Sequence, residues 1–523
     1  MATWIDTEAC IGCSWCNPLC PWEALEVSTD FVNQVDEEKC VRCLICVNVC
    51  PLDAIRVPPC MVACPIHMDI PGYLSLCGDG KFVEGYNLMR RTNALPAVLG
   101  HICYHPCEDA CRSNYVDEAI AICAVKRFLS DQVDVDKLKV PRVVKRGKNV
   151  AIVGAGPAGL AAANELILLG YDVMMFEASP EPGGLLRYGI PEYRLPKGIL
   201  DKDIGYIQRL GVEIKTNTKV GKEVTLEELR RKFKAVFIAT GAQESLRLGI
   251  TGEDTPGVMT GVSFLRAINT GQSVDIKGKV LVIGGGNVAV DAARVALRKG
   301  AQQVTIVYRR EKQDMPAIKD EIKAVEEEGI DLQFLAAPTK VIAQNGKVSG
   351  IECVKMKLGA LDKSGRKTPS PIEGSQYVIN ADKVVVAVGQ APSLAPLGTD
   401  LTVNPRTLTT NLPGVYAGGD LVSRPSRAVE AMATGKKAAR YMHRYLHNKI
   451  EWLELVRQDL EKFSREEYRS RIPVEQRYSI PREAAKKRVK DFREVERTYS
   501  ESDARAEARR CVGRRICSEY KKP

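Results

Sequence analysis

Two runs of cysteines near the start of the chain carry its clearest chemistry. The first run contains Cys10, Cys13, Cys16 and Cys20 and is followed directly by Pro21. The same spacing returns thirty positions later as Cys40, Cys43, Cys46 and Cys50, followed by Pro51. Cysteines spaced C-x2-C-x2-C-x3-C-P supply thiolates for pairs of [4Fe–4S] clusters. The repeat therefore predicts iron–sulfur chemistry in two related halves of one small unit.

The spacing also predicts which cysteines share a cluster. Three cysteines of a run hold one cluster and the fourth reaches across to the other. The first predicted ligand set is Cys10, Cys13, Cys16 and Cys50, and the second is Cys40, Cys43, Cys46 and Cys20. Zinc ribbons and disulfides are the alternatives, although zinc needs only four ligands at each site. We expect residues 1–57 to form a ferredoxin-like α+β domain whose clusters also hold its fold.

Length, charge and composition limit the remaining possibilities. A chain of 523 residues exceeds one ordinary core and predicts about three or four domains. Of eighteen cysteines, fifteen lie between residues 10 and 123 in metal-ligand spacings, which favours a reducing cytoplasm. We expect no secretion signal and no membrane span. The net charge of +10 includes a mixed-sign tail after residue 449, which we expect to be helical and solvated, or to dock an acidic redox partner, without binding nucleic acid.

A glycine-rich turn after residue 150 has the pattern of a dinucleotide-binding site. The stretch from Val150 to Gly159 reads as a strand followed by G-x-G-x-x-G, and an alanine-rich helix and a second strand ending in Glu177 come next. In this pattern the first glycine allows the turn, the second admits a pyrophosphate and the third lets helix and strand pack. The terminal acid would accept hydrogen bonds from a ribose.

A second unit of the same kind begins at Lys279. Its fingerprint is Gly284, Gly286 and Ala289, and its second strand ends in Arg309 and Arg310 where the first unit has an acid. Arginines at this position can hold a 2′-phosphate, which favours NADP(H) over NAD(H), although exposed arginines are often only solvated. Two such units predict two different dinucleotides, a flavin on the first and a nicotinamide on the second.

These motifs together resemble the FAD-dependent NAD(P)H oxidoreductase family of the glutamate synthase small subunit. The resemblance spans about residues 60–446 and is most specific in residues 181–196, in Tyr308-Arg-Arg with Met315-Pro-Ala, and in Gly418-Gly-Asp. It implies an FAD-binding domain at 145–262 and 403–448, a NAD(P)H-binding domain at 263–402 inserted in it, and a helical iron–sulfur cap at 58–144. The fold class is therefore multidomain α/β with two Rossmann-like domains.

The resemblance and the two glycine turns together give the candidate cofactor residues. The residues predicted to bind FAD are Gly154, Gly156, Pro157, Ala158, Gly159, Glu177, Gly184, Leu185, Arg194, Thr240, Gly241, Gly419 and Asp420. The residues predicted to bind NAD(P) are Gly284, Gly286, Asn287, Val288, Ala289, Arg309, Arg310, Val388 and Gly389. No side chain is predicted to act as a catalytic acid, base or nucleophile, because cofactors carry the chemistry.

The cap is expected to hold at least one further cluster. The resemblance assigns one [4Fe–4S] cluster to Cys64, Cys103, Cys107 and Cys123, and half of a second to Cys60 and Cys111. The C-x2-C that completes the second cluster in relatives is absent, so ligation and simple burial stay open for these two cysteines. A cluster motif that ends some relatives is degenerate here, because only Cys511 and Cys517 of its four ligands remain. This tail is either a remnant or is completed by another subunit.

The predicted function is electron transfer between NAD(P)H, FAD and [4Fe–4S] clusters. The expected partner is ferredoxin or a redox metalloenzyme subunit in a hetero-oligomeric complex. Two alternatives stay open: a glutamate synthase small subunit, and a non-catalytic wiring subunit with an idle nicotinamide site. A disulfide reductase related to thioredoxin reductase is disfavoured, because Cys353 stands alone in the second dinucleotide unit.

Overall fold

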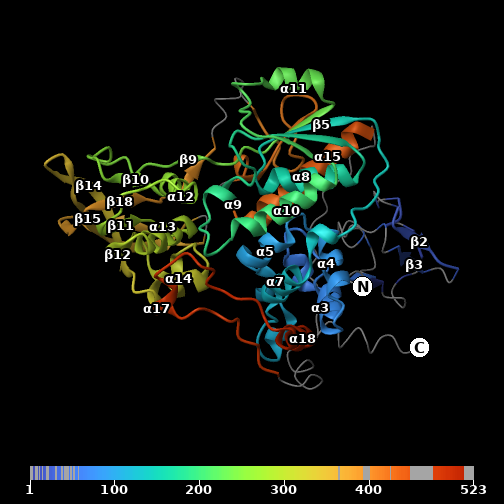
Figure 1. The fold of residues 1–523 in the computed structure, drawn as a ribbon, viewed down its shortest axis with the longest axis horizontal. Coiled ribbons are helices and arrows are strands. Elements are labelled where there is room, and N and C mark those ends of the chain that lie inside the picture. The colour runs from blue at the N-terminus through green and yellow to red at the C-terminus, as the bar shows by residue number, and fades with distance from the viewer. Residues whose placement is uncertain are drawn as a thin grey trace.

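The computed structural model shows two parallel sheets, each with its own helices, and a helical region that lies next to both (Figure 1). It describes residues 58–362, 365–392, 401–423, 426–447 and 475–511. Before residue 58 it describes residues 4–5, 10, 12–14, 16–18, 20, 23–29, 32–36, 39, 46, 50 and 54–56. No helix within these ranges has the length and apolarity needed to cross a bilayer.

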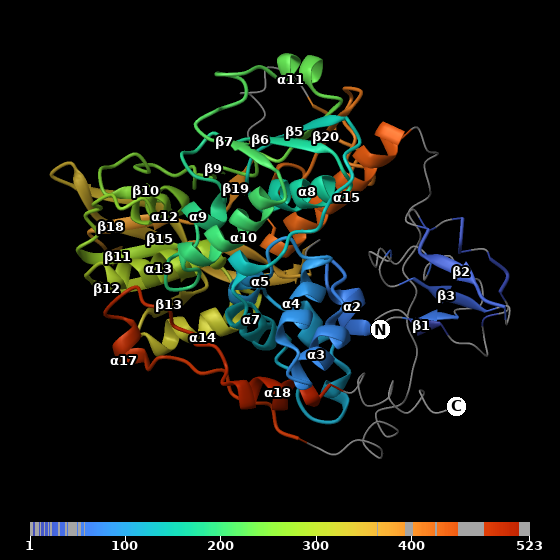
Figure 2. The same ribbon diagram turned by 45° about the vertical axis from the view of Figure 1, so that its right-hand side comes forward.

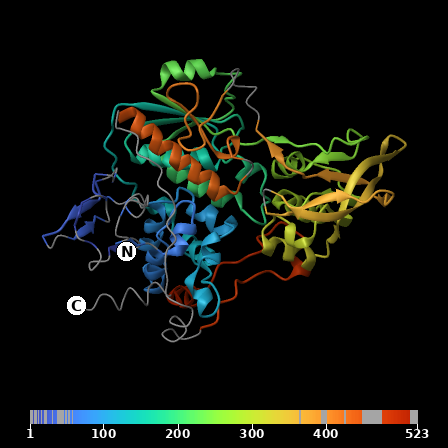
Figure 3. The same ribbon diagram turned by 180° about the vertical axis from the view of Figure 1, so that it is seen from behind.

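The first dinucleotide unit is built on a five-stranded parallel sheet. Its strand order is β20-β8-β5-β6-β7, which places the first strand of the unit at the centre. The strands are β5 (Asn149–Val153), β6 (Asp172–Phe176), β7 (Glu213–Lys215), β8 (Ala235–Ile238) and β20 (Val415–Ala417). The helices are α8 (Pro157–Leu168), α9 (Leu185–Tyr188), α10 (Lys197–Arg209), α11 (Leu226–Lys232) and α15 (Ala428–His447). Helix α15 runs under the sheet against α8, as seen from behind (Figure 3).

The second unit is a separate five-stranded parallel sheet of order β10-β18-β11-β12-β13, again with the strand before the glycine turn, β11, at its centre. Its edge strand β10 precedes the other four strands in the chain, whereas β20 follows those of the first sheet. Its strands are β10 (Val258–Thr260), β11 (Gly278–Ile283), β12 (Ala301–Tyr308), β13 (Asp331–Phe334) and β18 (Lys383–Val386). Its helices are α12 (Gly261–Asn269), α13 (Asn287–Arg298) and α14 (Lys319–Glu327). An antiparallel sheet extends from it, formed by β14 (Ala336–Gln344), β15 (Lys347–Leu361), β16 (Lys367–Pro371) and β17 (Tyr377–Asn380).

The two units are joined by a pair of short antiparallel strands, β9 (Glu244–Ser245) and β19 (Gln390–Ala391). Strand β10 lies before the predicted boundary at residue 263, yet it pairs with β18 of the second sheet. The second unit therefore begins earlier in the structure than the sequence suggested. Strand β20 then returns the chain to the first sheet after the second one is complete.

A helical region lies beneath the first sheet and beside the second. It contains α2 (Pro59–Ala63), α3 (Ile70–Gly78), α4 (Phe82–Arg90), α5 (Pro96–Ile102), α6 (Pro106–Asp109) and α7 (Ile122–Gln132), with 3₁₀ turns at Arg112–Tyr115 and Val135–Lys137. Close packing of α5 on α7 requires Gly100, whose added Cβ would lie 2.8 Å from the Arg127 Cα. We call this region, with residues 58–138, the cap.

The N-terminal module lies beside α2 (Figure 2). Strand β1 (Trp4–Ile5) pairs antiparallel with β4 (Ile55–Arg56), and β2 (Leu25–Val27) pairs antiparallel with β3 (Asn33–Val35). Its small buried core includes Cys16 and Cys50, and it also takes in Met61 of α2. The module and the cap therefore share a packed contact.

The described part of the C-terminal tail differs from the solvated helical tail expected from its charges. Residues 475–511 contain only the short helices α17 (Ala485–Arg488) and α18 (Glu501–Arg509), joined by extended chain. Helix α18 packs on α3 and α7, while Arg488 contacts the second unit through ion pairs with Glu327 and Glu328. Several of its charged side chains are buried, because they pair with groups of the domains beneath. We call residues 475–511 the strap, since they run from one domain to the other (Figures 1 and 2).

Candidate functional site

The first glycine turn has the close backbone contacts that its sequence predicted. Gly154 has a φ of 99°, and a Cβ added there would lie 2.4 Å from the Ala239 carbonyl oxygen. A Cβ on Gly159 would lie 2.0 Å from the Gly154 carbonyl oxygen, so α8 packs directly on the turn. Only glycine fits at these two positions. The turn thus exposes backbone at the N-terminus of α8, the arrangement that suits a pyrophosphate.

Two polar side chains flank this turn where a nucleotide would lie. The buried Glu177 carboxylate accepts hydrogen bonds from the Ala155 N–H at 2.8 Å and from the Ser179 N–H at 2.8 Å. The buried hydroxyl of Thr240 has no hydrogen-bond partner among the described residues. A buried hydroxyl without a partner is costly unless a ligand satisfies it. The donor and acceptor set therefore fits a bound dinucleotide.

The segment that carries the most specific family motif folds back onto the same turn. The Gly183 N–H donates to the Ala155 carbonyl oxygen at 2.8 Å. Gly184 has a φ of 55°, and a Cβ there would lie 2.9 Å from the Gly156 Cα. The predicted residues Gly184 and Leu185 are thereby brought beside the first turn, with Leu185 facing the cavity described below.

The second glycine turn has the same construction. Gly284 has a φ of 142°, and its added Cβ would lie 2.3 Å from the Ala387 carbonyl oxygen. Ala289 is fully buried under it, and the Asn287 side chain accepts a hydrogen bond from the Ile318 N–H at 3.0 Å. The prediction missed Gly285, where a Cβ would lie 2.5 Å from the Tyr308 ring. This turn also fits a dinucleotide.

The two predicted phosphate-binding arginines have different surroundings. Arg309 is exposed just beyond the end of β12. Arg310 is buried, with its Nη2 atom 2.7 Å from Asp362 Oδ2 and its Nε atom donating to the Lys367 carbonyl oxygen at 2.7 Å. Arg309 is therefore the more available of the two for an incoming phosphate.

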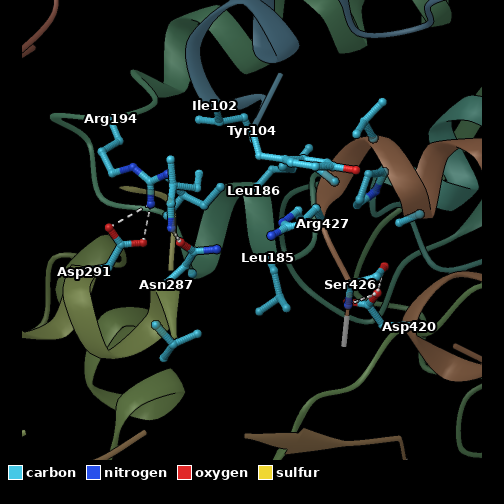
Figure 4. A pocket seen from close by; sticks show the side chains of 18 of the residues that line it. Ile102, Tyr104, Leu185, Leu186, Arg194, Asn287, Asp291, Asp420, Ser426 and Arg427 are labelled. Atoms are coloured by element: carbon cyan, nitrogen blue, oxygen red, sulfur yellow. Dashed lines mark hydrogen bonds and ion pairs between the residues drawn. The ribbon is translucent and has the colours of Figure 1, made fainter. Parts of the chain in front are cut away.

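One cavity lies where both dinucleotide units meet the cap (Figure 4). Predicted FAD residues in its wall are Pro157, Leu185, Arg194 and Asp420, and predicted NAD(P) residues there are Asn287 and Val288. The cap contributes Ile102, Cys103 and Tyr104. Residues that are distant in sequence and assigned to three different cofactors thus share one wall.

Two polar contacts fix the walls of this cavity. Arg194 of the first unit pairs with Asp291 of α13, with Nη1 and Oδ2 2.7 Å apart, and this ion pair crosses between the units (Figure 4). The Asp420 carboxylate accepts hydrogen bonds from the Ser426 N–H at 2.9 Å and hydroxyl at 2.6 Å. Burial raises the pKa of Asp420, and the bonds from Ser426 oppose that rise. Asp291 was not predicted, because nothing local in the sequence links it to Arg194.

The cap side of the cavity carries a group that sequence analysis did not identify. The Tyr104 hydroxyl donates to Glu430 Oε1 at 2.9 Å, and the Arg427 guanidinium lies 3.9 Å from the Tyr104 ring centroid. Burial, with the Glu430 hydrogen bond next, raises the pKa of Tyr104 to about 12. Tyr104 follows Cys103 directly in the chain, and this adjacency to a predicted ligand is the signal that could have identified it.

The four cysteines predicted for the cap cluster gather around one buried lysine. Cys64 and Cys107 are buried, while Cys103 and Cys123 are partly exposed. Burial lowers the pKa of Lys126, but the thiols of Cys103, Cys123, Cys107 and Cys64 raise it above its ordinary value. Lys126 was not predicted, although it lies one helical turn after Cys123 on α7. The donor set suits a thiolate-bound cluster with a positive charge beside it.

The N-terminal module also brings predicted ligands together. The pKa of Cys16 is raised to about 11, mainly by burial and to a smaller extent by Cys50, Cys13 and Cys10 nearby. Both halves of the repeat use the same backbone contact: the Ala24 N–H donates to Cys20 Sγ at 3.3 Å and the Ala54 N–H donates to Cys50 Sγ at 3.3 Å. Such hydrogen bonds to sulfur tune cluster potentials. Cys40 and Cys43 lie outside the described residues.

Among the described side chains no three His, Cys, Asp or Glu residues converge on the position of one metal ion. In a cubane each cysteine binds a different iron, so its thiolates stand further apart than the ligands of a single ion. The cysteines supply the type of ligand that a cubane requires, and the two ligand sets stay predictions.

Three family models match parts of the chain. Residues 148–435 match the pyridine nucleotide-disulphide oxidoreductase family. Residues 24–138 match dihydropyrimidine dehydrogenase domain II with its 4Fe-4S cluster, and residues 3–26 match the 4Fe-4S binding domain. The chain belongs to the pyridine nucleotide-disulphide oxidoreductase family, in the branch that resembles the glutamate synthase small chain and carries N-terminal 4Fe-4S domains.

Three individual proteins illustrate which members of this family the chain is similar to. The chain is 42% identical over 505 residues to the NADP(+)-dependent formate dehydrogenase subunit beta of Moorella thermoacetica, covering 87% of this chain and 70% of the relative. It is 38% identical over 502 residues to the NADPH-Fe(3+) oxidoreductase subunit beta of Geobacter sulfurreducens, covering 87% and 74%. It is 35% identical over 422 residues to the glutamate synthase [NADPH] small chain of Escherichia coli, covering 73% and 87%.

Among solved structures, Mycobacterium tuberculosis FprA in complex with NADPH has a TM-score of 0.51 and 24% identity, covering 58% of this chain and 85% of FprA. At this level of identity the likeness concerns the fold alone. It agrees with two Rossmann-like units in the central part of the chain.

Proposed function

We propose that this chain is the NADPH-linked, flavin-containing electron-transfer subunit of a hetero-oligomeric redox enzyme. One observation carries the proposal: Cys103, a member of the cap thiol group, lines the same cavity as Pro157 of the first glycine turn and Asn287 of the second. A nicotinamide, a flavin and an iron–sulfur cluster held by these three elements would meet at one place. Electron transfer requires such proximity, whereas separate binding functions do not.

The two dinucleotide units have different proposed occupants. FAD is proposed for the unit built on β5, β6, β7, β8 and β20, and NADPH for the unit built on β10, β11, β12, β13 and β18 that interrupts it. A bound flavin takes two electrons at once from a nicotinamide and releases them singly, as [4Fe–4S] clusters require. Glu177 and Thr240 would hold the nucleotide part of FAD, because one is an acceptor beside the turn and the other is an unsatisfied buried hydroxyl.

The chain's own residues position the cofactors and exclude water. The buried Arg194–Asp291 ion pair holds the first and second units at a fixed separation across the cavity. Tyr104, stacked under Arg427 and bonded to Glu430, closes the cap side. Asp420, Gly419 and Gly241 would complete the flavin site, and Val388 and Gly389 the nicotinamide site. No side chain need act as an acid or base, because no proton must be moved by the protein in hydride transfer.

We propose that the chain holds three [4Fe–4S] clusters. The N-terminal module would hold two [4Fe–4S] clusters, and the cap would hold one beside the cavity. The outlet is proposed to be the N-terminal module, because its core is packed against α2 of the cap. The partner would be ferredoxin or a metalloenzyme subunit, which is supported by two relatives whose names describe beta subunits.

The primary test is an anaerobic titration of the purified full-length chain with NADPH and, separately, with NADH. Flavin and cluster absorbance are followed, and iron is determined on the same sample. We expect NADPH to bleach both chromophores. Bleaching of flavin with intact clusters would contradict the proposed path. If neither nucleotide bleaches a sample that is replete in flavin and iron, a wiring subunit with an idle nicotinamide site is favoured. If the chain forms glutamate when an amidotransferase chain is added, a glutamate synthase small subunit is favoured.

The preference for NADPH has its own test in the two neighbouring arginines. We expect Arg309→Ala to weaken NADPH binding by about 10- to 100-fold, because a charge-assisted hydrogen bond contributes roughly 1.5–3 kcal/mol. NADH binding should change little. Arg310→Ala is the matched comparison, because it removes the ion pair with Asp362 and should weaken both nucleotides alike or lower stability. Equal weakening of both nucleotides by Arg309→Ala would refute its role at the 2′-phosphate.

A further inference from the structure

Helix α7 of the cap begins at Ile122 and carries the predicted cluster ligand Cys123 in its first turn. The alanine at its N-cap, Ala121, offers no side-chain acceptor to the first N–H groups of the helix. Two glutamates from distant parts of the chain take that place. Glu108 of α6 accepts a hydrogen bond from the Cys123 N–H at 2.8 Å, and Glu507 of α18 accepts one from the Ala121 N–H at 2.7 Å. The unpaired N–H groups and the dipole at a helix N-terminus favour such negative charges.

Both glutamates are buried, so each needs a compensating positive charge. The Glu108 side chain is 5% exposed and the Glu507 side chain is 0% exposed. Arg477 Nη2 lies 2.8 Å from Glu108 Oε2, and Arg510 Nη1 lies 2.8 Å from Glu507 Oε1. His105 Nδ1 lies further from Glu108 Oε2, at 3.7 Å. The strap therefore supplies two arginines that compensate the carboxylates at the start of α7.

Arg477 is held in place by contacts with the cap and with α18. Its Nη1 atom donates to the Ala119 carbonyl oxygen at 3.3 Å. The next residue, Tyr478, donates its N–H to Glu507 Oε2 at 3.0 Å. The start of the strap is thereby tied to α18, which packs on α3 and α7. This network fixes the Arg477 guanidinium against Glu108.

Glu108 links two predicted ligands of one cluster. It follows Cys107 directly in the chain, and its carboxylate holds the backbone N–H of Cys123. The carboxylate therefore lies one hydrogen bond from a ligand of the cap cluster proposed beside the cavity, which we call the cavity-side cluster. A cluster gains one negative charge on reduction, so charges and hydrogen bonds beside its ligands change its reduction potential.

We propose that Arg477 of the strap is a positioning residue for the cavity-side cluster, which fixes the backbone of Cys123 through Glu108 and raises the reduction potential of the cluster. This inference rests on the proposed function and extends it to the C-terminal tail. Arg477 acts through Glu108, which accepts hydrogen bonds from both the guanidinium and the Cys123 N–H. Without the guanidinium, the carboxylate would present an uncompensated negative charge to a cluster that must accept an electron. This role is independent of the degenerate motif at the end of the chain, of which Cys511 is described and Cys517 lies outside the described residues.

The experiment measures the midpoint potential of the cavity-side cluster in the full-length protein purified anaerobically. A titration with dithionite and redox mediators is followed by electron paramagnetic resonance, and the signal that is altered in Cys123→Ser identifies the cluster. We expect Arg477→Gln to make this cluster about tenfold harder to reduce, because an uncompensated carboxylate repels the added electron. For a one-electron couple this is a shift of about 59 mV to more negative potential.

Two further variants test whether the charge of Arg477 is responsible. Arg477→Lys keeps the charge and should restore most of the potential. Arg493→Gln is the control within the strap, because Arg493 is 79% exposed and pairs with Asp491, so water and salt screen its charge. The potential of the cavity-side cluster in Arg493→Gln should match that in the wild type. A shift in Arg477→Lys as large as that in Arg477→Gln would overturn the proposal.

Glu108→Gln separates the effect of charge from that of structure. The glutamine oxygen can still accept the Cys123 N–H, but the negative charge is gone and the Arg477 guanidinium remains. We therefore expect a shift to more positive potential, opposite in sign to that of Arg477→Gln. Shifts of the same sign in the two variants, or an unchanged potential in Arg477→Gln, would overturn the proposal. If Arg477→Gln loses iron or unfolds, the sign of the shift in Glu108→Gln decides.

Reduction by dithionite does not depend on the nicotinamide site, so this inference and the proposed function can fail separately. A cluster that shows both shifts but that NADPH cannot reduce would refute the proposed function and uphold the role of Arg477. A cluster that NADPH reduces, with a potential that Arg477→Gln leaves unchanged, would do the reverse. If no signal depends on Cys123, this inference fails, whereas bleaching of the flavin by NADPH would still support the flavin and nicotinamide sites.

Discussion

At the scale of single residues, Lys126 is the charge best placed to set the properties of the cavity-side cluster. It is 4% exposed, and the four cysteines of the cap group raise its pKa when they are thiolates, because negative charge beside it favours the ammonium form. A fixed positive charge favours the reduced cluster, which carries one more negative charge, and buried charges are weakly screened. We expect Lys126→Met to lower the midpoint potential of that cluster by on the order of 50–150 mV. A redox titration followed by electron paramagnetic resonance measures this.

The matched control for Lys126 is Lys137, which is 84% exposed and paired with Asp134. Lys137→Met removes the same charge from the protein surface, where water and salt screen it. The midpoint potential of the cavity-side cluster in Lys137→Met should match that in the wild type. If Lys126→Met also leaves the potential unchanged, the ammonium does not act on the cluster.

Residues near each other in sequence were predicted well, and residues that meet only in the fold were not. The two glycine turns could be predicted, because the strand, turn and helix that define each of them are continuous in the chain. Arg309 and Arg310 could not be distinguished, because the partner that engages Arg310, Asp362, comes from a distant part of the chain. The ion pair of Arg194 with Asp291 depends on packing between the two dinucleotide units.

At the scale of elements, the packing of α15 on α8 holds the first glycine turn in place. A Cβ added to Gly435 of α15 would lie 2.0 Å from the Ala158 carbonyl oxygen, so the helices touch through their backbones. We expect Gly435→Ala to push α15 away and to cost roughly 1–3 kcal/mol of stability, as overpacking does. Because Ala158 lies in the turn, flavin retention on gel filtration should fall as well. Thermal unfolding and the flavin-to-protein ratio measure the two effects.

Gly205 provides the control for this prediction. It lies in the interior of α10, and a Cβ there would meet nothing within 4 Å. Gly205→Ala should leave flavin content unchanged and raise stability by about 0.4–1 kcal/mol, because alanine loses less backbone entropy on folding. If Gly435→Ala keeps the flavin retention and the stability of the wild type, α15 can move without disturbing the first glycine turn.

At the scale of the whole molecule, the strap connects the cap to the second unit. One end of it is held in the cap by Glu507 and Arg510. The other end is held by Arg488, whose guanidinium is buried against Glu328 at the end of α14. The strap therefore limits how far the second unit can move relative to the cavity. This restraint suits a site in which all cofactors must stay close.

Glu328 is the group on which the outer end of the strap depends. Its carboxylate lies 2.7 Å from Arg294 Nη2, 2.7 Å from Arg298 Nη1 and 3.0 Å from Arg488 Nε, and none of these groups is exposed. Burial would raise the pKa of Glu328, but hydrogen bonds from Arg298 and Arg294 lower it to about 2, so the group is charged at neutral pH. Three buried arginines thus pair with this carboxylate. Arg294 and Arg488 also pair with Glu321 and Glu327, whereas the ion pair of Arg298 is with Glu328.

We expect Glu328→Gln to destabilise the second unit by about 3–5 kcal/mol, because removing one partner leaves buried charge uncompensated. Hydrogen exchange should rise in residues 475–511 and in α14, and the thermal transition of the second unit should move down. Glu326→Gln is the control on the same helix, because its pair with Lys312 is about half exposed, at 49% and 44%, and should contribute less than about 1 kcal/mol. If the strap is equally protected from hydrogen exchange in both variants, the buried arginines are compensated without Glu328. Another contact then holds the two domains together.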